Sequence, residues 1–413
     1  MFKRTRTVFL KDPSFPKVIT LSLILFFIFL ADAILSFWAP TFIEDSFESP
    51  FLMGLIMSFS SIVGFGADVI LPQIIKGISV RKLLFLSIIL SLIFALSLFS
   101  ATFRPYLAIF LLAMAIWGVY YEFLGFANQQ FVSDSVPFKS HSTAWAIISV
   151  FKNLAYFLGP LFAGWLLYLS EGFLVSGVIF FLLIALLVFL TSYKNHARPL
   201  EIDVTQVNLG SELEHWLVLF RRVWPMVTMS LVLGLIDATF WTTGAVWTEK
   251  LSQQSFFGSF FLPFYTLPSL FLGFVVAKWG VFSGKKRVAI VSLLAGGILL
   301  LFLGISGAIW LQLFLVLLIA TSLSVTYPMV DAVYSDILAR MGRKRKHLIG
   351  LSNSTISISY IIGPSLAGYV AEQIGEKLTF SVLGILTFFV AAFLFFTTPK
   401  KLHLPQRIIK MWD

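Results

Sequence analysis

Long apolar runs of this sequence contain charged side chains, and five of these are the residues that could do chemistry there: Asp32, Glu122, Lys152, Asp237 and Asp331. An ionised side chain at the centre of a bilayer costs about 2.5–3.5 kcal/mol on insertion scales, so we expect each to have a partner or to meet a water-filled cavity. A carboxyl group in such a cavity can take up and release a proton.

The two aspartates have similar local sequences, LADA at 30–33 and LIDA at 235–238. We expect both carboxyl groups to face one cavity between two halves of the chain. The alternative is a structural role, in which each aspartate pairs with a neighbour or caps a break in its helix. Small and polar residues at helical spacing from them support a cavity-facing stripe: Ser36 after Asp32, and Ser230, Gly234, Trp241 and Gly244 around Asp237.

Glu122 and Lys152 fall at similar depths in two adjacent antiparallel apolar runs. At a rise of 1.5 Å per residue this depth allows an ion pair between them. Such a pair either opens when a ligand or proton arrives or is static, and the sequence does not distinguish the two. Asp331 is a further cavity candidate, because Ser324, Pro328 and Ser335 share its helical face.

Aromatic residues beside these charges could line a pocket for flat or cationic compounds, since ring faces attract cations. The alternative for each ring is packing between helices or anchoring at the membrane interface. The predicted cavity lining is Ser36, Trp38, Trp117, Tyr121, Asn153 and Trp241.

The elements that carry these residues are membrane spans. Hydrophobic residues make up 58% of the 413 residues, charged residues 12%, and the mean hydropathy is +0.93. The apolar runs are about 20 residues long, which suits a helix crossing a bilayer and is too long for a barrel strand. The sequence therefore predicts an all-α membrane protein. A polar, basic segment precedes the first run without a small-residue cleavage site, so we expect that run to be retained.

Twelve spans follow from breaking the apolar runs at prolines, glycines and charges. Nearly all of the 30 Lys and Arg residues then fall on the side of the N-terminus, whereas Arg104, Lys250 and Lys377 fall on the other. Both termini are thus predicted to be cytoplasmic, and the net charge of +10 needs no nucleic-acid partner. The predicted spans are 17–39, 50–75, 82–103, 105–133, 141–169, 172–193, 222–247, 253–279, 286–306, 308–336, 347–371 and 376–397.

An internal repeat divides the chain. GPLFAGWL at 159–166 recurs as GPSLAGYV at 363–370, and the two aspartates recur at nearly the same offset of roughly 200 residues. Two six-helix copies inserted the same way up should be related by a pseudo-two-fold axis along the membrane normal. The predicted domains are a bundle at 1–193, a cytoplasmic linker with a short amphipathic helix at 194–221, a second bundle at 222–398 and a tail at 399–413.

These features resemble the major facilitator superfamily (MFS) of secondary transporters, and the resemblance covers almost the whole chain. Residues 127–166 are similar to the signature that joins the family's fourth and fifth spans, and Asp32 to Thr41 resembles the first-span motif of drug:proton antiporters. The fifth-span motif of antiporters, which packs helices closely, is matched by Gly159, Pro160 and Gly164, with Gly363, Pro364 and Gly368 in the second copy.

The sequence departs from the family in the loop after the second span. KGISVRKLL at 76–84 has Lys76 where the family has an acid and keeps only Arg81 and Lys82. Asp68, earlier in the second span, is the candidate replacement for that acid. The fourth-span arginine is also missing, its place falling near Met114. The predicted cytoplasmic gate comprises Asp68, Arg81, Lys82, Asp134, Lys285 and Asp336.

The resemblance implies a proton-coupled transporter that works by alternating access. The fifth-span motif favours efflux of a lipophilic neutral or cationic compound by an antiporter; a proton-coupled importer of a nutrient is the alternative. An enzyme is not expected, because HExxH, GxSxG and nucleotide-binding loops are lacking, and a transport-inactive sensor is a third interpretation. The chain has no cysteine, so thiolate chemistry is excluded. We expect no cofactor or metal, and a functional monomer in the plasma membrane.

Overall fold

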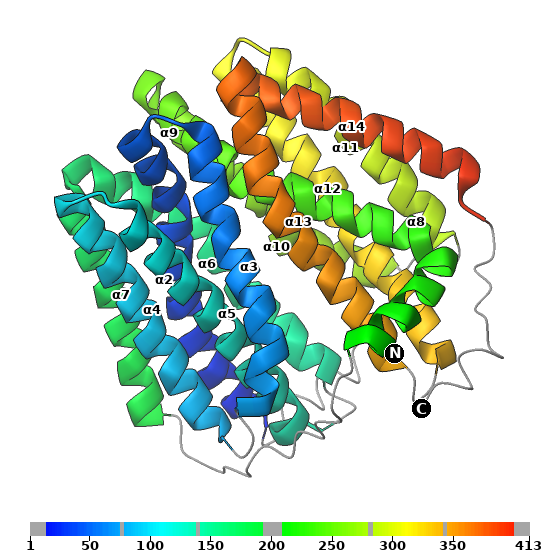
Figure 1. The fold of residues 1–413 in the computed structure, drawn as a ribbon, viewed down its shortest axis with the longest axis horizontal. Coiled ribbons are helices and arrows are strands. Elements are labelled where there is room, and N and C mark those ends of the chain that lie inside the picture. Colours follow the sequence, from blue (N-terminus) through cyan, green and yellow to red (C-terminus); the bar gives the residue numbers. More distant parts are fainter. Residues whose placement is uncertain are drawn as a thin grey trace. The chain divides into compact units, whose positions relative to one another are not determined.

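The computed structural model describes residues 14–74, 78–137, 141–192, 209–279, 284–341 and 345–399. Within these ranges every regular element is helical (Figure 1). Ten of the helices are long and apolar enough to cross a membrane. The predicted all-α fold class is therefore confirmed.

The chain forms two compact units, and residues 1–48 and 59–204 make up the first. Here α2 packs against α6 and α7, and α4 packs against α5. The helices of this half are α2 (Phe15–Phe47), α3 (Pro50–Ile74), α4 (Val80–Phe103), α5 (Leu107–Ser135), α6 (His141–Leu169) and α7 (Glu171–Ser192).

Residues 49–58 and 205–413 make up the second unit, so the start of α3 belongs to it. Here α8 packs against α13, and α11 packs against α12 and α14. The helices of this half are α8 (Leu209–Trp241), α9 (Thr243–Gln254), α10 (Phe261–Trp279), α11 (Lys285–Ile305), α12 (Ile309–Met341), α13 (Arg345–Ile374) and α14 (Glu376–Thr397), with the 3-10 turn η2 (Phe256–Phe260) before α10.

Local sequence explains several helix ends. A proline in the first turn starts α2, where a missing N–H costs nothing, and α2 ends at Glu48 in the left-handed conformation (φ 51°). The Ser79 hydroxyl accepts a hydrogen bond from Lys82 N at 3.4 Å and caps α4. Gly284 and Gly375, with φ of 75° and 88°, precede α11 and α14 at positions that disfavour other residues.

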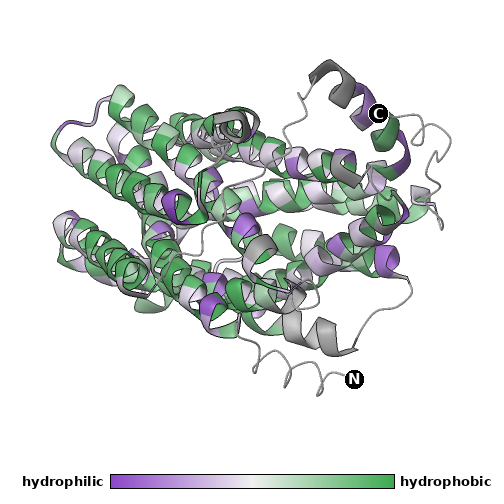
Figure 2. Cartoon of the chain, turned by 90° about the horizontal axis from the view of Figure 1, so that it is seen from below, coloured by the Kyte–Doolittle hydropathy of each residue, from purple (hydrophilic) through white to green (hydrophobic). Residues whose placement is uncertain are grey.

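The first helix of each half is the most buried one. The most apolar stretches of α2 and of the α8–α9 segment are 72% and 78% buried, against at most 44% for the other candidate spans. Many large apolar side chains on the other helices are exposed, such as Tyr168 and Phe396. Figure 2 shows the helices coloured as hydrophobic over most of their length. This pattern fits helices that meet lipid on the outside of each unit.

Two elements differ from the prediction. The segment around Ser211 and Glu214, predicted as a separate short helix, is continuous with α8. The seventh span breaks at Thr242, whose φ and ψ of −115° and −87° are not helical, and continues as α9. Residues 193–208, which hold most of the predicted linker, and the tail from residue 400 lie outside the described residues.

Candidate functional site

The carboxyl group of Asp32 is fully buried in the first unit and accepts three hydrogen bonds. Trp117 Nε1 donates to Oδ1 at 2.9 Å, the Tyr120 hydroxyl donates to the same oxygen, and the Tyr156 hydroxyl donates to Oδ2 at 2.5 Å. α2 supplies the acid, α5 two donors and α6 the third. Such donors replace the water that a carboxylate loses on burial.

The carboxyl group of Asp237 is held in a similar way in the second unit. Tyr265 of α10 donates to Oδ1 at 2.6 Å, and Tyr360 of α13 donates to Oδ2. Tyr327 of α12 donates instead to the backbone carbonyl of Leu233, one turn earlier on α8, at 3.0 Å. The two predicted acids thus point into their own units and are bound by tyrosine hydroxyls. That they share one cavity stays a prediction.

Tyr156 and Tyr360 occupy the same place in the two halves. Each stands three residues before a Gly–Pro pair, in YFLGP and YIIGP. Both tyrosines were missed in the predicted site, and this repeated Tyr-x-x-Gly-Pro pattern is the signal that would have found them.

Close helix packing brings each tyrosine to its aspartate. Gly159 packs directly on Ala33, the residue after Asp32, and a Cβ added at Gly363 would lie 2.7 Å from the Cβ of Ala238, the residue after Asp237. The lack of a side chain on these glycines lets the first and fifth helices of each half approach closely.

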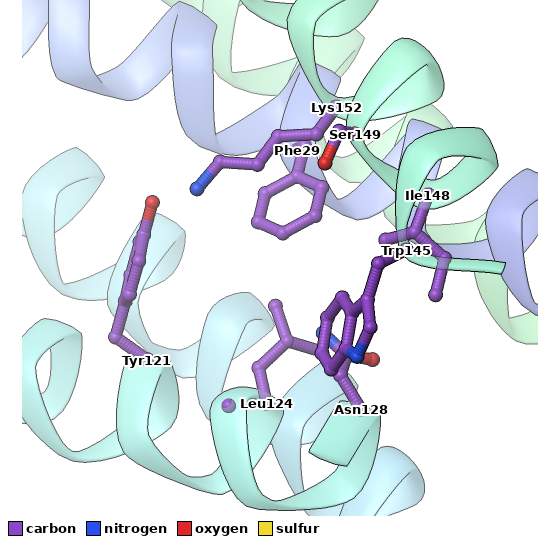
Figure 3. A pocket seen from close by; sticks show the side chains of 9 residues that line it. Phe29, Tyr121, Leu124, Asn128, Trp145, Ile148, Ser149 and Lys152 are labelled. Carbon is purple, nitrogen blue, oxygen red and sulfur yellow. The ribbon is translucent and has the colours of Figure 1, made fainter. Parts of the chain in front are cut away.

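A cavity of about 230 Å³ lies beside this network in the first unit. Figure 3 shows the polar ends of Lys152 and Tyr121 pointing toward one another across it. The Lys152 ammonium lies 5.1 Å from the ring centre of Phe29 and is close enough to Asp32 to attract its charge. The lining comes from α2, α5 and α6: Phe29, Tyr121, Leu124, Gly125, Asn128, Trp145, Ile148, Ser149 and Lys152.

A hydrogen bond between two tyrosines connects the cavity to the Asp32 network. The Tyr121 hydroxyl, which lines the cavity, pairs with the Tyr156 hydroxyl, which donates to Asp32.

The predicted ion pair between Glu122 and Lys152 is wrong. The Glu122 side chain is hydrogen-bonded to Asp68 of α3, and its Oε1 would lie 3.5 Å from a Cβ added at Gly64. Gly118 packs against Ser60 and Gly64, which brings α3 and α5 close enough for this contact. A hydrogen bond between two carboxyl groups is possible only when one of them carries a proton. Asp68 was predicted to belong to the cytoplasmic gate instead.

The other predicted cavity residues divide into three groups. Tyr121 lines the cavity and Trp117 binds Asp32, as described above. Trp38 is buried and stacks on Phe42, with ring centres 4.8 Å apart, so it packs within the bundle and does not line this cavity. Ser36 is buried, Asn153 and Trp241 are half-buried, and none of the three lines this cavity.

Asp331 is exposed on α12, and its backbone carbonyl accepts a hydrogen bond from Ser335. Ser230, on the predicted stripe around Asp237, lies 3.5 Å from the Tyr334 hydroxyl.

At the predicted gate, Lys285 Nζ lies 2.7 Å from Asp336 Oδ2 and joins α11 to α12. The Arg81 guanidinium lies 5.7 Å from the ring centre of Phe189 on α7, and Lys82 is exposed. The side chain of Asp134 and all of Lys76 lie outside the described part of the chain.

The glycines of the packing motif behave differently from one another. Gly368 packs on the Pro50 carbonyl and the Pro364 carbonyl packs on Gly54, whereas a Cβ at Gly164 would meet nothing within 4 Å. Close packing at Gly164 was therefore wrongly predicted. Pro160 and Pro364 lie inside α6 and α13. Among the described residues no group of His, Cys, Asp and Glu could hold a metal ion.

The long apolar helices and the buried carboxyl groups define a multi-pass helical membrane protein. The sequence model of the Major Facilitator Superfamily matches residues 21–264 and 250–410, so the chain belongs to this family. The family indicates a transporter rather than an enzyme. Comparison with curated protein sequences gives no match.

Solved structures with similar folds include several transporters. A structure of proton dependent oligopeptide transporters has a TM-score of 0.73 at 12% identity and covers 96% of this chain and 100% of that one. The fucose:proton symporter FucP of E. coli has a TM-score of 0.57 at 16% identity, and the match covers 92% of this chain and 99% of that one. The human organic anion transporter MFSD10 has a TM-score of 0.58 at 18% identity, and the match covers 92% of this chain and 100% of that one. At these identities the likeness concerns the fold alone.

Proposed function

We propose that this chain is a proton-coupled secondary transporter in which Asp32 and Asp237 carry the protons. The observation that supports this best is the repeated arrangement in the two units, where an acid on the first helix accepts a hydrogen bond from a tyrosine on the fifth. Intramembrane acids of this kind mark proton pathways. Two of the similar folds are described as proton-dependent transporters of peptides or fucose.

Protonation changes what each aspartate can do with its neighbours. An ionised carboxyl group only accepts hydrogen bonds, whereas a protonated one also donates. Uptake of a proton by Asp32 therefore weakens the bonds that it accepts and adds a donor, for which the hydroxyl of Tyr120 or Tyr156 can become the acceptor. We propose that this rearrangement biases the alternating access of the two halves, with both termini cytoplasmic and the protein in the plasma membrane.

The direction of transport has two candidates. The fifth-span motif favours efflux of a neutral or cationic compound by an antiporter. The position of Lys152 favours symport of an anion, because protonation of Asp32 removes a negative charge that attracts the lysine, so proton and anion can bind together.

Proteoliposomes with a trapped pH-sensitive dye test the proposal. Candidate compounds of negative, positive and zero charge are added outside, with protein-free liposomes as the control for passive permeation. Symport acidifies the lumen and antiport makes it more alkaline. Protein-dependent flux of a compound with no accompanying pH change would contradict proton coupling.

Asp32→Asn and Asp237→Asn keep the size of the side chain and replace the ionisable carboxyl group with an amide that cannot take up or release a proton. We expect both variants to be expressed and folded, and to lose the protein-dependent pH change. Glu48→Gln is the control, since Glu48 is exposed at the end of α2, and should keep it. Coupling at the unmodified level in both site variants would refute the assigned role.

A further inference from the structure

The cavity between α2, α5 and α6 has the wrong charge for a cationic cargo. Lys152 is the only one of the nine lining residues with a full charge at neutral pH, and Asp32, whose charge it attracts, is enclosed by Trp117 and two tyrosines. The lining residues include no carboxylate. The cavity is thus suited to an anion.

The size and the walls of the cavity restrict that anion further. Phe29, Tyr121 and Trp145 present rings from three helices (Figure 3). A cavity of about 150 Å³ holds benzene, whereas pockets for drug-sized ligands measure roughly 300–1,000 Å³. A volume of about 230 Å³ therefore fits one aromatic ring with a small acidic substituent.

A buried amide provides the third feature. Asn128 lines the cavity, is 7% exposed, and its Oδ1 has no hydrogen-bond partner among the described residues. A buried acceptor without a partner is costly, so its position indicates a ligand donor such as a ring hydroxyl.

The second unit lacks an equivalent of this cation. Lys152 stands four residues before Tyr156, and Ile356 stands four residues before Tyr360. Because both halves have the acid on the first helix and the tyrosine on the fifth, the lysine is a specialisation of the first unit and is not needed to build the acid–tyrosine pair.

We propose that this cavity binds a single-ring aromatic carboxylate, with the carboxylate against Lys152, the ring between Phe29 and Trp145, and a ring hydroxyl donating to Asn128. The further claim that this ligand is the transported substrate rests on the proposed function. The claim that it binds in the cavity does not.

Equilibrium binding to the full-length protein in detergent, by calorimetry and thermal stabilisation, tests the proposal without a proton gradient. Benzoate and 4-hydroxybenzoate are the probes. Benzamide removes the charge, benzylamine reverses it, and cyclohexanecarboxylate removes the ring. We expect both benzoates to bind more tightly than the three analogues, and 4-hydroxybenzoate to bind more tightly than benzoate.

Variants assign the contacts. Lys152→Gln should weaken benzoate binding about tenfold or more, as for a lost charged hydrogen bond, and Lys152→Arg should restore part of it. Lys17→Gln is the matched control, because Lys17 is exposed at the start of α2 and does not line the cavity. Asn128→Ala should remove the advantage of 4-hydroxybenzoate and leave benzoate binding nearly unchanged.

Several results would overturn the proposal: no benzoate binding, equal binding of benzamide or benzylamine, or unchanged affinity in Lys152→Gln. If that variant does not fold, the ligand series on the unmodified protein decides by itself. Benzoate binding without proton-linked flux would support this site and contradict the proposed function. Flux without benzoate binding would do the reverse.

Discussion

At the scale of single residues, the site consists of acids whose partners are tyrosines rather than bases. Asp32 and Asp237 were predictable from sequence, because a carboxyl group inside an apolar run needs compensation. Tyr156 and Tyr360 were predictable from their repeated pattern, but Tyr120 and Tyr265 were not, since one sequence does not show which helix faces meet. The error on Glu122 has the same cause: matching depth with Lys152 did not reveal that its side chain points to α3.

Tyr156→Phe and Tyr360→Phe each remove one donor from an aspartate and keep the ring. A hydrogen bond to a charged group contributes about 1.5–3 kcal/mol, so we expect proton-coupled flux to fall and its pH profile to change in both variants. Proteoliposome flux between pH 5 and 9 measures this.

Tyr369→Phe is the control for this pair, because Tyr369 is 52% exposed on α13. A pH profile in Tyr156→Phe and Tyr360→Phe that matches the control would show that these hydroxyls do not act on the aspartates.

At the scale of elements, the first and fifth helices of each half form the frame of each acid site. The repeated Gly–Pro motif predicted close packing, and the structure assigns that packing to Gly159 and Gly363 but not to Gly164. From the motif, Gly159 and Gly164 were both predicted to pack closely, because spacing alone does not show which small residue lies where the two helices cross.

Comparing the melting temperatures of Gly159→Ala and Gly164→Ala distinguishes the effect of close helix packing from the effect of helix propensity. At Gly159 the new Cβ meets Ala33, and overpacking costs about 1–3 kcal/mol, so the melting temperature in detergent should fall. At Gly164 the Cβ meets nothing within 4 Å, and alanine favours the helix by about 1 kcal/mol, so the melting temperature should hold or rise. Equal melting temperatures would contradict the packing role of Gly159.

At the scale of the whole molecule, hydropathy was sufficient for the fold class, because backbone groups in lipid must be satisfied within each span. The break at Thr242 was not predictable, since the surrounding apolar run continues through it. The inside and outside of the membrane are predicted from the distribution of Lys and Arg along the sequence.

Single cysteines test this orientation directly, because the chain has none of its own. Gln254 and Lys82 are both exposed, at the end of α9 and the start of α4. A membrane-impermeant maleimide should label Gln254→Cys in intact cells and Lys82→Cys only after permeabilisation. The opposite labelling pattern would reverse the predicted topology.

The hydrogen bond between Tyr121 and Tyr156 can couple ligand binding in the cavity to the protonation of Asp32. Two hydroxyl groups separate a guest in the cavity from the acid on α2, and each can reverse its donor direction without moving a helix. Tyr121→Phe removes the outer hydroxyl alone. We expect this variant to retain benzoate affinity in calorimetry while proton release or uptake on binding, measured in weakly buffered solution, disappears. Ligand binding in the cavity would then change the protonation of Asp32 through a reorientation of hydroxyl hydrogen atoms.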